Sequence, residues 1–189
     1  MLARTMIPAF SRQLPPPPGM SFPDVTPNDW FHDYVAWVYD KGFITGYEDG
    51  TFRPNNPITR EELAALMARA QGIPVRLAGS LPFSDTNRIS DWARNYVYAT
   101  NQQGWMLGDA NGSFRPQHHT TRAEITALFA RILGRGITNY YSLQDVSEDL
   151  RLFSDVTDPQ RWFYYYVIEA SHSHWYVMKD GVEIWISVD

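Results

Sequence analysis

An internal repeat is the feature that most constrains the fold of this chain. Ten residues of the first half recur in the second half, each displaced by 62 positions, as Gly46 recurs at Gly108. The first copies are Gly46, Gly50, Phe52, Arg53, Pro54, Thr59, Arg60, Glu62, Leu66 and Arg69. Self-similarity at a fixed spacing is typical of repeat architectures, in which stacked neighbours bury a shared core. The chain is therefore predicted to be an array of repeats.

A Phe-x-Asp motif opens each repeat and sets the domain boundaries. It occurs at Phe22, Phe83 and Phe153, and a tryptophan follows each copy. We predict repeats over residues 21–72 and 82–135, and a divergent or truncated third repeat over residues 152–189. Residues 1–20 contain a run of prolines, which favours an extended polyproline conformation, so we read them as a disordered leader or linker.

Each full repeat is predicted to form a helix, a loop and a second helix. In the first repeat, apolar residues at helical spacing indicate a helix from Trp30 to Tyr39, ending before Gly42. Two further glycines and a proline then mark a loop. Thr59-Arg60-Glu61-Glu62 has the form of a capping box, which predicts the start of the second helix. The apolar faces of such helices need partners, so neighbouring repeats must pack together.

The third repeat departs from this pattern. Asp158-Pro159 is predicted to start a helix that runs through Trp162 and Val167, because proline suits the first helical turn. Lys179-Asp180-Gly181 then indicates a turn between two short strands, Trp175 to Met178 and Val182 to Ser187. The predicted fold class is mainly all-α, with a possible short C-terminal β-hairpin.

Charge and composition argue against several classes of function. The 16 Lys and Arg residues are outnumbered by 21 Asp and Glu residues, so general attraction to nucleic acid or to an acidic membrane is not expected. There is no cysteine, and no continuous apolar stretch is long enough for a signal peptide or a membrane span. The chain by itself reads as soluble, without membrane insertion and without a visible export signal.

Motifs for catalysis and for metals or other cofactors are not found. The sequence lacks a nucleophile elbow, a phosphate loop and a metalloprotease helix, so we do not expect an enzyme. His172 and His174 are two positions apart and no carboxylate completes a clear set of ligands, so we expect neither a metal site nor a cofactor.

The motifs above closely resemble the S-layer homology repeat. The resemblance rests on Phe-x-Asp, Trp, Gly-Phe-Ile-x-Gly-Tyr-x-Asp-Gly-Thr-Phe-Arg-Pro and Ile-Thr-Arg-x-Glu in the first repeat; the second has Gly108-Asp109 where the family commonly has Gly-Tyr. It implies three helix-loop-helix units about a pseudo-threefold axis, with ligand grooves between them. It also implies non-covalent anchoring at the cell wall or S-layer, outside the cell, through a pyruvylated secondary cell-wall polysaccharide.

The resemblance implies that the motif arginines, Arg60 and Arg122, meet the carboxylate of the ketal-linked pyruvate. Their place in the first turn of a predicted helix also favours an anion, although a surface salt bridge is the alternative. Softer candidates are tryptophans that stack on sugar or pack in the core, glycines that allow close approach, and cap residues that contact the ligand or only begin the helix. These are Trp30, Trp92, Gly46, Gly108, Thr59, Thr121, Glu62 and Glu124.

Two other classes of function stay open. The repeats could serve as a structural or oligomerisation module, with self-association through the aromatic third repeat. A wall-glycan hydrolase or its fragment is the third class. Without its second helix, the third repeat either exposes apolar surface or covers the gap with the predicted hairpin.

Overall fold

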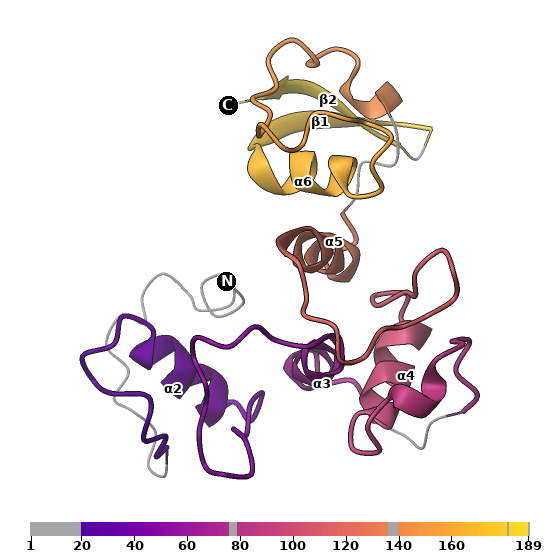
Figure 1. Cartoon of the computed structure of the whole chain (residues 1–189). Coiled ribbons are helices and arrows are strands. Elements are labelled where there is room, and N and C mark those ends of the chain that lie inside the picture. Colours follow the sequence, from indigo (N-terminus) through magenta and orange to yellow (C-terminus); the bar gives the residue numbers. More distant parts are fainter. Residues whose placement is uncertain (1–19, 76–78, 136–139, 181, 189) are drawn as a thin grey trace. The chain divides into compact units, whose positions relative to one another are not determined.

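A computed structural model describes residues 20–75, 79–135, 140–180 and 182–188 of the chain (Figure 1). All but the last residue of the predicted leader lies outside this part. The chain divides into two compact units, Met1–His119 and Thr120–Asp189, which we call the N-terminal and C-terminal units. No helix within the described residues combines the length and the apolar character needed to cross a membrane.

Helices dominate both units, and the only sheet within the described residues is a C-terminal hairpin. The N-terminal unit contains α2 (His32–Asp40), α3 (Arg60–Ala70), the 3-10 turn η1 (Thr86–Arg88) and α4 (Arg94–Gln102). The C-terminal unit contains α5 (Arg122–Ile132), the 3-10 turn η2 (Tyr140–Leu143), α6 (Tyr164–Ser171), β1 (His174–Lys179) and β2 (Val182–Val188). The prediction of a mainly α-helical fold ending in a hairpin is confirmed.

The Phe-x-Asp opening closes the glycine-rich loop of its own repeat. The Asp24 carboxylate accepts hydrogen bonds from the amides of Phe52 (2.9 Å) and Arg53 (2.6 Å). Asp85 accepts equivalent bonds from the amides of Phe114 (2.7 Å) and Arg115 (2.8 Å). Burial raises the pKa of Asp24, but the hydrogen bonds from these amides outweigh this effect. The net pKa of Asp24 therefore lies below the usual value.

Capping boxes start the second helix of both full repeats, as predicted. At α3 the Thr59 side chain accepts from the Glu62 amide while the Glu62 carboxylate accepts from the Thr59 amide, and Thr121 and Glu124 repeat this arrangement at α5. Helix α3 packs against α4, the first helix of the next repeat, and α5 packs against α6 in the same way. The second helix of each full repeat therefore packs against the first helix of the next repeat, and the prediction that neighbouring repeats pack together is confirmed.

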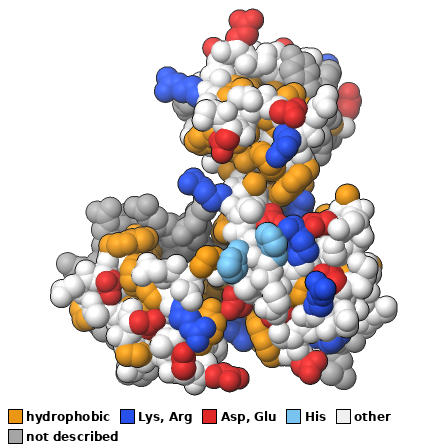
Figure 2. All heavy atoms as spheres, viewed as in Figure 1, with side chains coloured by type: hydrophobic (Ala, Val, Ile, Leu, Met, Phe, Trp, Pro, Cys, Tyr) orange, Lys and Arg blue, Asp and Glu red, His pale blue; other side chains and the backbone are white. Residues whose placement is uncertain are grey.

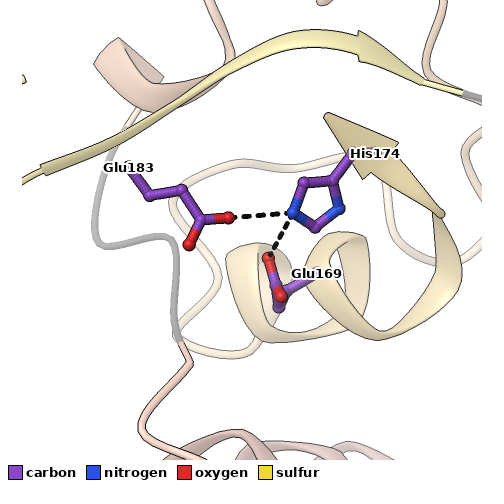
Figure 3. Close-up of side chains that lie close together, drawn as sticks. All are labelled: Glu169, His174 and Glu183. Carbon is purple, nitrogen blue, oxygen red and sulfur yellow. Dashed lines mark hydrogen bonds and ion pairs between the residues drawn. The ribbon is translucent and has the colours of Figure 1, made fainter. Parts of the chain in front are cut away.

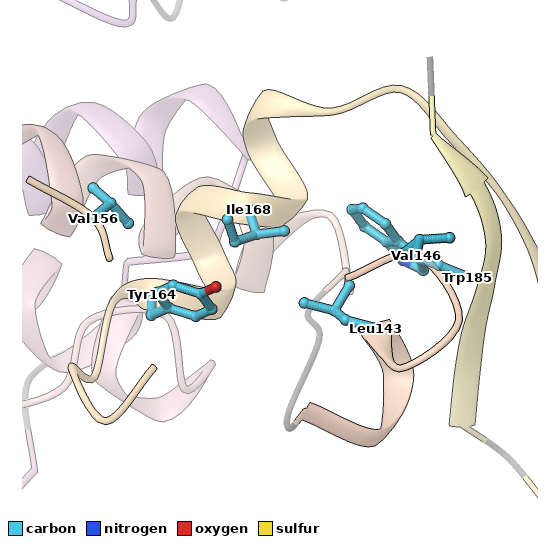
Figure 4. Packing of buried hydrophobic residues seen from close by; sticks show 6 residues of the cluster. All are labelled: Leu143, Val146, Val156, Tyr164, Ile168 and Trp185. Carbon is cyan, nitrogen blue, oxygen red and sulfur yellow. The ribbon is translucent and has the colours of Figure 1, made fainter. Parts of the chain in front are cut away.

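The hairpin completes the core of the C-terminal unit. Strands β1 and β2 are antiparallel, with a bulge between Trp175 and Tyr176. Figure 4 shows the buried cluster, in which Trp185 from β2 is fully buried beside Leu143 and Val146, with Tyr164 and Ile168 from α6. These residues pack together between the hairpin and α6. The hairpin therefore covers apolar surface that the third repeat would otherwise expose.

Two predictions about helix starts were wrong. Helix α6 begins at Tyr164, since the Asp158 side chain accepts from the Gln160 amide and holds residues 158–161 in a turn. Helix α2 begins at His32, so Trp30 precedes it and is 80% exposed. The hypothesis that Trp30 packs in the core is therefore wrong, and Phe22, Val25 and Val35 form the first repeat's small core.

Candidate functional site

A groove of about 930 Å³ runs through the N-terminal unit, and we call it the repeat groove. One wall is the glycine-rich loop of the first repeat, the floor is one face of α3, and the other wall comes from the start of the second repeat. The residues that matter below are Gly46, Tyr47, Asp49, Arg53, Glu61, Glu62, Arg69, Ser90, Trp92, Tyr96 and Gln117.

The loop wall of the groove is a polar network with one cation. The Arg53 guanidinium donates to Asp49 at 2.8 Å and lies 4.0 Å from the centre of the Tyr47 ring. The Tyr47 hydroxyl donates to Glu62 at 2.8 Å. Burial and this bond to Glu62 together raise the pKa of Tyr47 to about 12, so the hydroxyl stays a donor at neutral pH. The network holds Arg53 against the loop while 41% of its side chain stays exposed.

The opposite wall presents aromatic rings, and a second cation lies on the floor of the groove. The Arg69 guanidinium, on α3, contacts the Tyr96 hydroxyl of α4 through Nε at 3.3 Å and Nη2 at 3.2 Å. Trp92, just before α4, is 52% exposed. An exposed indole face that lines the same groove as guanidinium groups can take the apolar face of a sugar ring while the cations meet an anionic substituent.

Arg60 lies away from the groove lining and is only 5% exposed. Its Nε donates to the Phe114 carbonyl at 2.7 Å and its Nη2 donates to the Leu107 carbonyl at 2.8 Å. The guanidinium also lies 4.9 Å from the centre of the Phe114 ring. These bonds hold the loop of the second repeat onto α3, and burial leaves the guanidinium little access to a ligand carboxylate.

Glu61 makes the neighbouring link between the two repeats. Its carboxylate accepts from the Ser90 amide (3.0 Å), the Ser90 hydroxyl (2.7 Å) and the Gln117 side chain (2.6 Å). The main-chain amides of Arg60 and Glu61 donate to the carbonyls of His118 and Pro116. The first turn of α3 therefore fixes the second repeat, and with it Trp92, at the edge of the groove.

Arg122 differs from Arg60 although the two are equivalent in the repeat. It begins α5 with an exposed side chain. The carbonyls that hold Arg60 come from the glycine-rich loop of the next repeat, whereas the repeat that follows Arg122 has strands β1 and β2 after its helix. A different contact does recur: Arg131 on α5 contacts Tyr166 on α6 as Arg69 contacts Tyr96.

The structure separates the other predicted site residues into distinct settings. Trp92, Gly46 and Glu62 line the groove, while Thr59, Thr121 and Glu124 are in the helix caps. Gly46 has φ +77°, and a Cβ there would overlap the Phe22 ring. A Cβ on Gly108 would likewise meet the Phe83 ring. Both glycines therefore make room for the repeat's own phenylalanine. Trp30 is exposed outside the groove lining.

Sequence reasoning did not single out Arg53, Arg69, Tyr47 and Tyr96 as site residues. Arg53, Arg69 and Tyr96 each belong to pairs that recur at the 62-residue spacing, which is the signal that would have found them. On the face drawn in Figure 2, basic and acidic side chains are interspersed, which agrees with local recognition by single arginines.

Comparisons with known proteins identify a family model that matches part of each full repeat. Residues 21–64 and 82–126 match the profile of the S-layer homology domain. The chain is 38% identical over 117 residues to an amylopullulanase of Thermoanaerobacterium thermosulfurigenes, covering 59% of this chain and 6% of that protein. It is 30% identical over 142 residues to S-layer protein EA1 of Bacillus anthracis, covering 74% of this chain and 15% of that protein.

A third relative is cell surface glycoprotein 1 of Acetivibrio thermocellus, 27% identical over 177 residues, which are 88% of this chain and 7% of that protein. The matched region thus spans at most 15% of these three relatives. Enzymes and S-layer proteins share it, which fits a non-catalytic module for cell-surface anchoring. The chain contains two S-layer homology domains, at residues 21–64 and 82–126.

Proposed function

We propose that this chain anchors a protein to the bacterial cell envelope, outside the cell, by binding an anionic, pyruvylated secondary cell-wall polysaccharide in the repeat groove. The observation that carries the proposal is that Arg53, Arg69 and exposed Trp92 all line one open groove. Relatives named as S-layer and cell-surface proteins support the location. The enzymatic relatives match only over a small part of their length, so we propose no catalytic role for this chain.

Each wall of the groove has a distinct part in the proposed complex. The Trp92 ring packs against the apolar face of a sugar, and Arg53 and Arg69 meet the carboxylate of its pyruvyl ketal, since a planar guanidinium matches a carboxylate. Arg60 acts indirectly, by holding the second repeat against α3. In the C-terminal unit Arg122 is exposed at the start of α5, where main-chain amides add to its attraction for a carboxylate.

Retention on isolated bacterial cell walls tests the proposal. We expect the double substitution Arg53→Gln plus Arg69→Gln to lower retention by at least about tenfold, since a charge-assisted hydrogen bond contributes about 1.5–3 kcal/mol. Trp92→Ala is expected to weaken it in the same assay. Arg88→Gln is the matched control, because Arg88 is exposed on η1 and does not line the groove.

Unchanged retention in the double variant would contradict the groove assignment. Loss of retention on Trp175→Ala instead would favour the alternative function, self-association through the third repeat. One observation favours that alternative: strand β1 exposes Trp175, Tyr176, Val177 and Met178. Sedimentation at rising protein concentration separates the two, because only self-association makes the apparent mass depend on concentration.

A further inference from the structure

Three side chains from three elements of the C-terminal unit converge on one point. Figure 3 shows Glu169 from α6, His174 from β1 and Glu183 from β2 pointing toward one another. The Nε2 atom of His174 lies 2.8 Å from Glu183 Oε1 and 3.9 Å from Glu169 Oε2. The atoms that the three residues offer all lie within 4.8 Å of one another. The three side chains could therefore hold one metal ion between them.

The His174 ring is held in one orientation. It stacks on the Trp185 ring with 3.6 Å between centroids and 12° between planes. Its Nδ1 lies 3.2 Å from the His172 carbonyl oxygen, which can only accept, so Nδ1 carries a proton. In the neutral ring Nε2 is then unprotonated, and it faces the Glu183 carboxylate at 2.8 Å. A carbonyl partner on the far nitrogen is the usual way in which proteins orient a metal-binding histidine.

With Nε2 unprotonated, its lone pair faces the carboxylate oxygen of Glu183, and a cation between them stabilises this arrangement. In this structure the cation is Arg135. Its Nε donates to Glu169 Oε1 at 2.7 Å, and its Nη2 lies 3.2 Å from His174 Nε2. The Arg135 side chain is 46% exposed, whereas the side chains of Glu169 and His174 are 7% and 3% exposed. The arginine can therefore move into solvent while the three candidate ligands stay in place.

We propose that Glu169, His174 and Glu183 bind a divalent transition-metal ion of the zinc class, which displaces Arg135. One imidazole nitrogen and two carboxylates are donors that zinc accepts, and three protein ligands leave a fourth position for water. Calcium prefers six to eight oxygen ligands and magnesium an octahedral shell, so both fit this set poorly. The bound ion ties α6 to both strands of the hairpin and stabilises the C-terminal unit.

Zinc titration of the chelator-treated full chain by calorimetry tests this assignment, with Co²⁺ absorption as a second readout. We expect one site. Removing a ligand, by His174→Gln or by Glu169→Gln plus Glu183→Gln, should weaken binding by at least the roughly 10–100-fold that loss of an outer-shell partner costs. Arg135→Ala should bind zinc about tenfold more tightly, because the competing cation is gone. His118→Ala, which changes an exposed histidine of the N-terminal unit, should bind as the wild type does.

The response to Arg135→Ala separates a metal site from a permanent ion-pair cluster. If His174 is simply protonated and paired with Glu183, neither the wild type nor this variant takes up zinc, and the proposal is overturned. Zinc binding that survives both ligand-removing variants would place the ion elsewhere and overturn it too. Near-UV circular dichroism checks the fold of each variant, and if His174→Gln loses its fold the double glutamine variant decides.

Discussion

The buried position of Arg60 predicts that its loss affects stability before it affects binding. Arg60→Ala removes two short hydrogen bonds from a charged donor to the carbonyls of Phe114 and Leu107. Each such bond contributes about 1.5–3 kcal/mol, so the variant should lose at least about 3 kcal/mol of the free energy of unfolding. For a unit of this size, that corresponds to a Tm lower by about 10 °C.

Thermal unfolding followed by circular dichroism provides the assay, and Arg122 provides the matched control. Arg122→Ala removes the equivalent but exposed side chain, so its effect should stay within about 0.5 kcal/mol. Arg60→Lys should recover part of the loss, since lysine keeps the charge but cannot present the same two donors. If Arg60→Ala unfolds within about 2 °C of the wild type, Arg60 is not a structural clamp and the reasoning fails.

Three further predictions concern other parts of the repeats. Gly46→Ala should destabilise the chain more than Gly42→Ala in urea unfolding, because both glycines have positive φ but only at Gly46 does a Cβ meet the Phe22 ring; equal losses would contradict this. Thr121→Ala should cost about 1 kcal/mol in the same assay through loss of the cap of α5, with no change if the cap is dispensable. Burial raises the pKa of Glu62, but hydrogen bonds from Thr59 and Tyr47 lower it to a net value below 4.5, so the contribution of Glu62 to stability is present above pH 4.5 and is lost as the pH falls further. Glu62→Gln should therefore weaken the fall in unfolding free energy at acid pH. An unchanged fall would show that other carboxylates cause it.

The local structure of the repeats could be predicted well because its signals are local. Thr59 and Glu62 are three residues apart, so the pattern of residue types itself specifies the cap of α3. The hairpin followed from apolar runs on both sides of Lys179-Asp180-Gly181. The start of α6 was missed because Pro159 is equally suited to a turn, and the Asp158 side chain stabilises the turn.

The site could be predicted only in part, because burial and contacts between repeats are not visible in one repeat's pattern. Arg60 and Arg122 are identical in motif, yet one is buried under the next loop and the other is exposed. The prediction that both bind the ligand could not separate them. Likewise, His174 showed no partners at short spacing, because its two carboxylates come together with it only when the hairpin lies on α6. The pseudo-threefold arrangement of the repeats stays a prediction.

The most direct test of the central claim, anchoring through an anionic wall polymer, is the retention of the wild-type chain on isolated cell walls before and after mild acid removes ketal-linked pyruvate. We predict retention on the untreated walls and its loss after treatment, because the groove arginines then have no carboxylate to meet. Equal retention on both walls, or none on either, would contradict the account.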